Sequence, residues 1–210
     1  MMVTNGTEFE HELIEALRAS DALREVVDRL PRLELPDCLL GAGCVAQTVW
    51  NRAHGKALSA GISDYDLVYF DPDRSEAAEQ VARDHARTIL GDLGLPLDVK
   101  NQGRVHLWYR ERFGCGIRPY ASAGDAIDSW PTTATAVAVG YDAGRLSVYA
   151  PFGLDDLFAG IVRANRVQIT PEIYASKLDR WLRHWPKLTV LPWEKGVGLE
   201  ATRWLDQPFT

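Results

Sequence analysis

Two aspartates, Asp64 and Asp66, stand one residue apart at the start of an otherwise apolar stretch, residues 65–70. In a β-strand, residues two positions apart point to the same face, so the two carboxylates would project together, about 7 Å apart at the backbone. Partly buried carboxylates repel each other and lose hydration, and a cation between them relieves both costs. Oxygen ligands suit Mg²⁺ or Mn²⁺, which take the rest of their shell from waters and a phosphorylated substrate. The pair therefore predicts a divalent metal site with a phosphate partner; a solvated strand end is the alternative.

A second stretch, from Leu39 to Val45, ends an apolar run with Gly41 and Gly43 and leads into a segment with helical spacing. Glycines at such a turn let backbone N–H groups approach a phosphate closely, and the N-terminus of the following helix adds a partial positive charge. The turn is a candidate cradle for a triphosphate. The alternative is a tight turn in which the glycines serve the backbone conformation alone.

A third carboxylate, Asp98, lies between Leu97 and Val99 in a run that reads as one strand or a hairpin from Leu97 to Tyr109. Alternation places Asp98 on the face opposite its apolar neighbours, where it could complete a three-carboxylate metal site. The same alternation predicts one shared polar face for Lys100, Gln102, Arg104, His106 and Trp108. Such a face suits an anionic or planar substrate, and the solvated outer face of a sheet is the alternative.

The elements that must position these residues follow from hydrophobic periodicity. Residues 7–31 read as two amphipathic helices, and alternation on both sides of residues 142–144 predicts a hairpin. Thr170 followed by Pro171 predicts the start of another helix. Further helices are expected over residues 75–90, 124–130 and 154–164. This order predicts the α+β class, with a mixed sheet and helices on one or both sides.

Two further features have ordinary explanations beside functional ones. An aromatic stripe at helical spacing near the C-terminus is assigned to packing: Tyr174, Trp181, Trp185 and Trp193. The segment "SWPTT", residues 129–133, either contacts the nucleotide or acceptor or simply ends a helix at Pro131.

The composition bounds the class of protein. The chain has 210 residues, 46% hydrophobic and 25% charged, which suits one globular domain. Its net charge of −6 gives no general attraction to nucleic acid or to anionic membranes. The N-terminus lacks the basic and then apolar pattern of a signal peptide, so we expect a cytoplasmic protein. The three cysteines lack the close spacing of a zinc site or disulfide framework and are expected to be reduced thiols.

The order of these features resembles the nucleotidyltransferase superfamily of the DNA polymerase β type: a strand, a glycine turn, a helix, Asp-x-Asp on the next strand and a single Asp on a later strand. The segments "KNQGRVHLWYRERFG", "SWPTTATAV", "YAPFGLDDLF" and "WPKLTVLPW" resemble a small bacterial nucleotidyltransferase-like family, which extends the similarity to about Trp193. The resemblance implies an α+β fold with a mixed, mainly antiparallel sheet flanked by helices and a C-terminal α/β extension. It implies one domain over residues 1–210: N-terminal helices over 1–36, a catalytic core over 37–115 and the extension over 116–210.

The resemblance also implies roles for individual residues. Asp64 and Asp66 would be shared ligands of two Mg²⁺ (or Mn²⁺) ions, and Asp98 a ligand of the ion that activates the acceptor. The expected nucleotide-binding residues are Gly41, Ala42, Gly43, Cys44 and Lys100. The expected acceptor-binding residues are Asn101, Arg104 and His106. Cys44 stands where the superfamily usually has Gly or Ser, and a thiol is a poorer hydrogen-bond donor than a hydroxyl, so backbone amides must take over much of the phosphate contact.

The function implied is transfer of an NMP group from an NTP, expected to be ATP, to an acceptor hydroxyl with release of pyrophosphate. The leading acceptor is a small molecule, for example of the aminoglycoside type. A protein or an RNA end is the second reading, so nucleic acid enters only as an acceptor, and a non-catalytic nucleotide-binding protein is the third. No membrane partner is expected, and the sequence identifies neither the acceptor nor the oligomeric state.

Overall fold

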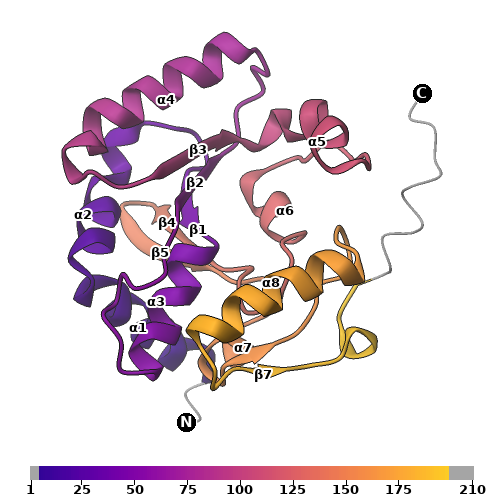
Figure 1. The fold of residues 1–210 in the computed structure, drawn as a ribbon. Helices are drawn as coiled ribbons and strands as arrows, with labels where there is room; N and C mark the ends of the chain where they lie inside the picture. Colours follow the sequence, from indigo (N-terminus) through magenta and orange to yellow (C-terminus); the bar gives the residue numbers. More distant parts are fainter. Residues whose placement is uncertain (1–4, 199–210) are drawn as a thin grey trace.

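The protein is described from a computed structural model over residues 5–198. A five-stranded sheet lies at its centre, in the order β3-β2-β1-β4-β5 (Figure 1). Strand β1 runs antiparallel to both β2 and β4, β4 runs antiparallel to β5, and β2 runs parallel to β3. The strands are β1 (Leu39–Gly41), β2 (Tyr65–Tyr69), β3 (Leu97–Asn101), β4 (Ala138–Asp142) and β5 (Arg145–Tyr149). The predicted α+β class with a mixed, mainly antiparallel sheet is confirmed.

Helices surround this sheet. The N-terminal helices gather on one side of the strands, and α5, α6 and α8 lie toward the other (Figure 1). The α-helices are α1 (Asn5–Ala19), α2 (Asp21–Arg29), α3 (Gly43–Ala53), α4 (Glu76–Leu90), α5 (Val105–Phe113), α6 (Ala123–Ile127), α7 (Asp155–Phe158) and α8 (Pro171–His184). The 3₁₀ turns are η1 (Leu30–Leu33), η2 (Gly91–Leu93), η3 (Gln102–Arg104) and η4 (Trp193–Lys195). A second, two-stranded parallel sheet joins β6 (Ile161–Val162) to β7 (Thr189–Val190).

Local sequence accounts for the helix starts. The Ser75 hydroxyl accepts a hydrogen bond from the Ala78 amide at 3.1 Å and caps α4. The Thr170 hydroxyl accepts from the Ile173 amide at 3.4 Å, and Pro171 takes the first position of α8. The predicted capped start of α8 is therefore confirmed.

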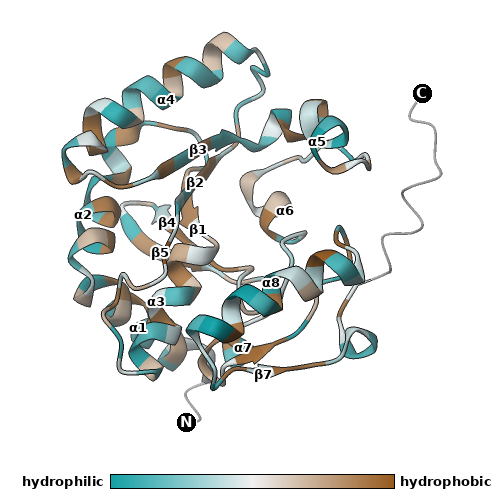
Figure 2. Ribbon diagram, in the orientation of Figure 1, coloured by the Kyte–Doolittle hydropathy of each residue, from teal (hydrophilic) through white to brown (hydrophobic). Residues whose placement is uncertain are grey.

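One continuous core joins distant parts of the chain. It contains buried residues from Leu13 in α1 to Leu188 before β7. Trp50 of α3 packs against Trp181 of α8 and Trp185 directly after α8, with ring centroids 5.4 and 5.5 Å apart. The central strands are correspondingly apolar, whereas α4 and α8 carry polar residues (Figure 2). The expectation that the C-terminal aromatic stripe packs in the core is confirmed for these two tryptophans.

Two expected elements are wrong. The strand expected from Leu97 to Tyr109 ends at Asn101, and the chain continues through η3 into α5. The Asn101 side chain accepts a hydrogen bond from the Gly103 amide at 2.9 Å, which turns the backbone away from the strand direction. The helix expected over residues 154–164 is only the short α7, because the chain turns at Gly160, whose φ is +65°, and enters β6.

No helix among residues 5–198 is long and apolar enough to cross a membrane. The domain boundaries expected at residues 1 and 210 lie outside the described residues.

Candidate active site

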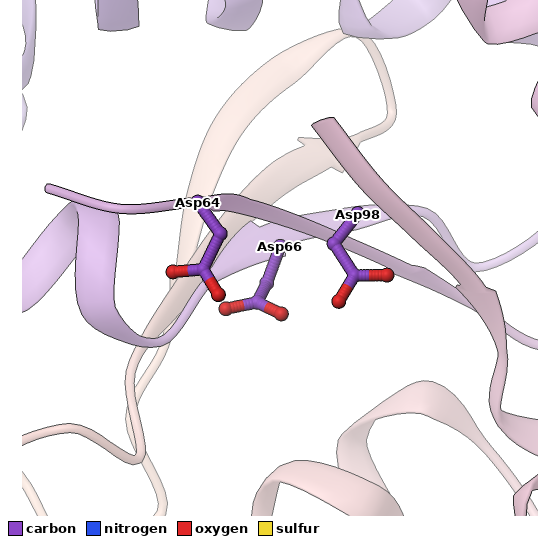
Figure 3. Close-up of side chains that lie close together, drawn as sticks. All are labelled: Asp64, Asp66 and Asp98. Atoms are coloured by element: carbon purple, nitrogen blue, oxygen red, sulfur yellow. The ribbon is translucent and has the colours of Figure 1, made fainter. Parts of the chain in front are cut away.

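Three carboxylates converge on the face of two parallel strands. Asp66 lies in β2 and Asp98 in β3, and the register pairs them directly across the sheet. Asp64 immediately precedes β2 and points to the same side (Figure 3). One oxygen from each of the three lies within 4.8 Å of the others. The convergence expected from the sequence is present, because residues two apart on one strand and registered neighbours on a parallel strand share a face.

The cluster is electrostatically strained without a cation. Burial and the neighbouring Asp64 carboxylate raise the pKa of Asp66 to about 7, against the opposing effect of Lys100 and Lys177. A carboxyl group whose charged form is this unfavourable gains from a divalent cation, and three oxygen donors at this spacing suit the hard cations Mg²⁺ and Mn²⁺. The residues present therefore fit the metal that the sequence analysis expects.

Lys100 already supplies one positive charge to the cluster. Its ammonium is ion-paired with Asp98, two residues away on the same strand face. The side chains of Lys100 and Asp98 are 27% and 36% exposed, so the pair lies within reach of solvent and of a ligand. A metal ion that binds Asp98 must compete with this ammonium.

The glycine turn adjoins the carboxylates. Ala42 has φ +59°, a conformation that favours glycine, and Ala42 and Gly43 line the same cavity as Asp64 and Asp66. A Cβ on Gly41 would lie 2.7 Å from the Ala138 Cβ, so glycine is required there for close packing of β1 against β4. The turn that opens α3 therefore presents backbone at the cavity wall.

Cys44 does not present its side chain to this cavity. The thiol is fully buried and donates a hydrogen bond to the Gly41 carbonyl oxygen at 3.2 Å. Burial raises the pKa of the thiol above its ordinary range. A phosphate contact expected at Cys44 is thereby limited to the backbone.

The cavity has a volume of about 320 Å³ and a second wall from α8. Lys177, Arg180 and Trp181 line it together with the glycine turn and the carboxylates Asp64 and Asp66. Burial lowers the pKa of Lys177, aided by Arg180, while Asp66 and Asp64 oppose the shift. Sequence reasoning missed both cations, because α8 was interpreted as a packing helix; their spacing of three residues, which puts them on one helix face, was the available signal.

Buried polar and aromatic groups complete the lining. Gln47 of α3 is 5% exposed, and its side-chain oxygen has no hydrogen-bond partner among the described residues. Ser129 and Trp130 of the "SWPTT" segment reach the cavity, so its functional reading gains support from the structure. Aromatic rings from α5 and the following loops form much of the remaining surface: Trp108, Tyr109, Phe113 and Tyr120.

The three residues expected to bind the acceptor do not line this cavity, because the strand that was to align them ends at Asn101. Asn101 is buried, and its side chain donates to the Asp71 and Asp73 carbonyls at 3.0 Å each. Arg104 is ion-paired with the buried Glu79. His106 is half-buried on α5, and none of the three belongs to the cavity lining.

Comparisons with known proteins agree with this geometry. A family model described as nucleotidyltransferase matches residues 28–190. An NMR structure described as revealing a CCA-adding enzyme head domain is similar to this chain, with a TM-score of 0.68 and 26% sequence identity over 86% of this chain and 95% of that chain. A comparison with curated proteins gives no match. The matched residues include the three carboxylates, the glycine turn and the cavity-lining cations of α8.

Proposed function

Because the chain belongs to the nucleotidyltransferase family, we propose that it transfers an NMP group from ATP to an acceptor hydroxyl and releases pyrophosphate. The observation that carries this proposal is the convergence of Asp64, Asp66 and Asp98 beside the glycine turn. Enzymes of this family use an NTP and divalent metal ions, and the trio supplies the acidic ligands such chemistry needs.

Mg²⁺ is the metal we propose, held by Asp64, Asp66 and Asp98. When bound, it supplies charge neutralisation at the phosphates and lowers the pKa of the acceptor hydroxyl. The protein's own part is to bring three carboxylates to one face of β2 and β3 before any ligand arrives.

The triphosphate is proposed to lie between the glycine turn and α8. Ala42 and Gly43 line the cavity at the start of α3. The Ala42 amide already donates to the Val137 carbonyl at 3.0 Å, so the Gly43 amide and the partial positive charge of the α3 N-terminus are the groups proposed to contact the phosphates. Lys177 and Arg180 line the same cavity as the turn and are proposed to balance the phosphate charge. Asp98 would be among the residues that hold the metal, and Lys100, now ion-paired with it, is proposed to contact the phosphates.

The reaction requires one bond to form and one to break. The acceptor oxygen bonds to the α-phosphorus, and the bond from that phosphorus to the oxygen bridging to the β-phosphorus breaks, which releases pyrophosphate. The Asp98 carboxylate accepts the hydroxyl proton. Electrostatic positioning supplies most of the acceleration, as expected for phosphoryl chemistry.

For the acceptor, a small molecule remains our first candidate, because the cavity of about 320 Å³ must hold the nucleotide as well and leaves modest space. An RNA end is the second candidate. The similar NMR structure is described as revealing a CCA-adding enzyme head domain, and this description favours an RNA end as the acceptor.

Thermal unfolding with nucleotide tests the proposal. ATP with Mg²⁺ should raise the Tm, since a ligand that binds only the folded state stabilises it by mass action. Asp64→Ala should abolish the rise, whereas Asp142→Ala, a change at an exposed hairpin aspartate, should leave it intact. The proposal fails if no NTP raises the Tm, or if the rise is the same in the Asp64 variant.

A further inference from the structure

A second hollow adjoins the carboxylate cluster at the free edge of the sheet. It has a volume of about 490 Å³ and lies between α4, the edge strand β3 and the end of α5. Its lining carries four cationic side chains and one carboxylate: Arg83, Arg87, Lys100, Arg112 and Asp98. We call this hollow the basic groove. Arg87 is ion-paired with Asp84, and Lys100 with Asp98. Arg83 and Arg104 share the single carboxylate of Glu79, and Arg112 adds a further positive charge. In a chain whose net charge is −6, this remaining local excess of positive charge points to an anionic ligand.

Two of these arginines are held in place before any ligand arrives. The Arg83 guanidinium donates to the Val99 carbonyl at 3.2 Å and to the Glu79 carboxylate at 2.8 Å, and Glu79 is shared with Arg104. The Arg112 guanidinium lies over the rings of Trp108 and Phe113, 5.9 and 5.5 Å from their centroids. Fixed guanidinium groups lose little freedom on binding an anion, which distinguishes this lining from a solvated surface of mobile side chains.

The basic groove is continuous with the reaction centre. Lys100 lines both the groove and the catalytic cavity. Asp98 lines the groove and also belongs to the carboxylate cluster. A molecule seated in the groove therefore approaches the cluster from the side of Asp98, opposite to the glycine turn proposed for the triphosphate.

We propose that the basic groove binds a phosphoryl group of the acceptor, so that the acceptor is a phosphate ester whose hydroxyl is presented at Asp98. The inference rests on the proposed function for the position of the attacking hydroxyl. Guanidinium groups match phosphate oxygens with paired hydrogen bonds, and Arg83, Arg87 and Arg112 surround one space. A cationic acceptor such as an aminoglycoside is disfavoured by the same charges.

The test is a titration of inorganic phosphate followed by amide and arginine Nε–H NMR shifts. The catalytic cavity is first saturated with a non-hydrolysable ATP analogue and Mg²⁺, so that phosphate reports on other sites. We expect saturable shifts confined to Arg87, Gly91, Val99 and Arg112. The double variant Arg87→Gln, Arg112→Gln should weaken phosphate binding at least about tenfold, since each lost charge-assisted hydrogen bond matters on that scale.

The matched control is the double variant Arg52→Gln, Arg110→Gln, which removes two exposed arginines that do not line the groove. It should bind phosphate as the wild type does. The proposal is overturned if phosphate causes no saturable shift at the groove, or if the groove and control variants weaken binding equally. Two parallel titrations, one with glucose 6-phosphate and one with a short single-stranded oligonucleotide, identify the source of the phosphate. The ligand that binds the groove more tightly represents the class of acceptor.

The same spectra separate this inference from the proposed function. Shifts at Asp64 and Asp66 on addition of the ATP analogue report nucleotide binding at the cluster. If phosphate binds the groove but the analogue does not bind the cluster, the proposed function fails and the phosphate site stands. If the analogue binds and phosphate does not, the groove proposal fails alone.

Discussion

Lys100 and a divalent cation compete for one carboxylate, because Lys100 is ion-paired with Asp98. Lys100→Met removes the competitor but also removes a positive charge proposed to contact the phosphates. We therefore expect tighter Mn²⁺ binding in the absence of nucleotide and a raised KM for ATP. Calorimetry with Mn²⁺ and steady-state pyrophosphate release measure the two effects, with the exposed Lys187→Met as control. Weaker Mn²⁺ binding in the Lys100 variant would contradict this account.

Glu79 is a buried carboxylate beside the site, and its charge needs partners to be stable there. It is 1% exposed, accepts a hydrogen bond from the Asn101 amide at 3.0 Å, and pairs with Arg83 and Arg104. Glu79→Gln leaves these guanidinium groups without their carboxylate, and we expect a loss of about 3 kcal/mol in the free energy of unfolding. Urea unfolding measures it, and the exposed Glu76→Gln serves as control. A loss of unfolding free energy no larger than that of the control would show that the ion pairs of Glu79 with Arg83 and Arg104 contribute no stability.

The positions of some site residues could be predicted from the sequence, because they depend only on neighbouring residues in the chain. Asp64 and Asp66 share a strand face by the two-residue repeat alone. The spacing of Lys177 and Arg180 indicates one shared helix face, but it does not indicate that this face lines the site. Only the packing of α8 against α3 brings them to a cavity lined by residues more than 100 positions earlier. The sequence after Asn101 is ambiguous: the position of Asn101 before Gly103 indicates a turn, but the alternation beyond it matches a strand equally well.

Among the elements, α7 packs into the core through Leu157 and Phe158 and also makes polar contacts through one carboxylate, that of Asp156. Asp156 accepts hydrogen bonds from the Thr133 hydroxyl at 2.6 Å and the Arg163 Nε at 2.9 Å. Burial acts to raise the pKa of Asp156, but the hydrogen bonds from Arg163 and Thr133 outweigh it, so the pKa lies below its ordinary value. A carboxyl group with a lowered folded-state pKa contributes stability above its unfolded pKa of about 3.9 and loses it as the pH falls through the folded value.

Asp156→Asn should therefore lower the Tm at pH 7, and the difference from the wild type should shrink as the pH is reduced below about 4. Circular dichroism melts across that range measure it. Asp155→Asn, at the neighbouring exposed position, is the control and should show little difference at any pH. If the difference in Tm between the wild type and the Asp156 variant is the same at every pH, ionised Asp156 does not have this role.

For the strand β3, the sequence predicted the start correctly and the end incorrectly. Its start was predictable from the alternation around Asp98. Its end depends on Asn101, whose side chain accepts from the Gly103 amide and also makes a tertiary contact, donating to the Asp71 and Asp73 carbonyls in the loop after β2. The polar face expected beyond Asn101 is consequently replaced by α5, whose aromatic residues reach the cavity instead.

At the scale of the whole molecule, we propose that the chain folds as one domain. The Trp185 indole nitrogen of the segment after α8 donates to the Asn51 side-chain oxygen of α3 at 2.8 Å, and both residues are buried. The core joins the N-terminal helices, the sheet and the C-terminal segment. The subdivision into residues 1–36, 37–115 and 116–210 stays a description of parts that share this core.

One domain should unfold in one transition. Tryptophan fluorescence reports on all seven tryptophans, among them the packed Trp50, Trp181 and Trp185. We expect it and far-ultraviolet circular dichroism to give coincident urea midpoints. Trp185→Phe removes the hydrogen bond to Asn51 and should shift both midpoints together. Separate midpoints in the wild type would show that the C-terminal part folds independently.

The most direct test of the central claim is a crystal structure with a non-hydrolysable ATP analogue and Mn²⁺, using the anomalous signal of manganese to locate the ions. We predict manganese bound by oxygens of Asp64, Asp66 and Asp98, with Lys100 moved from Asp98 to the phosphates. The triphosphate should lie between Gly43 and Lys177. Manganese bound elsewhere, or Asp98 still paired with Lys100 while the nucleotide is bound, would contradict the account.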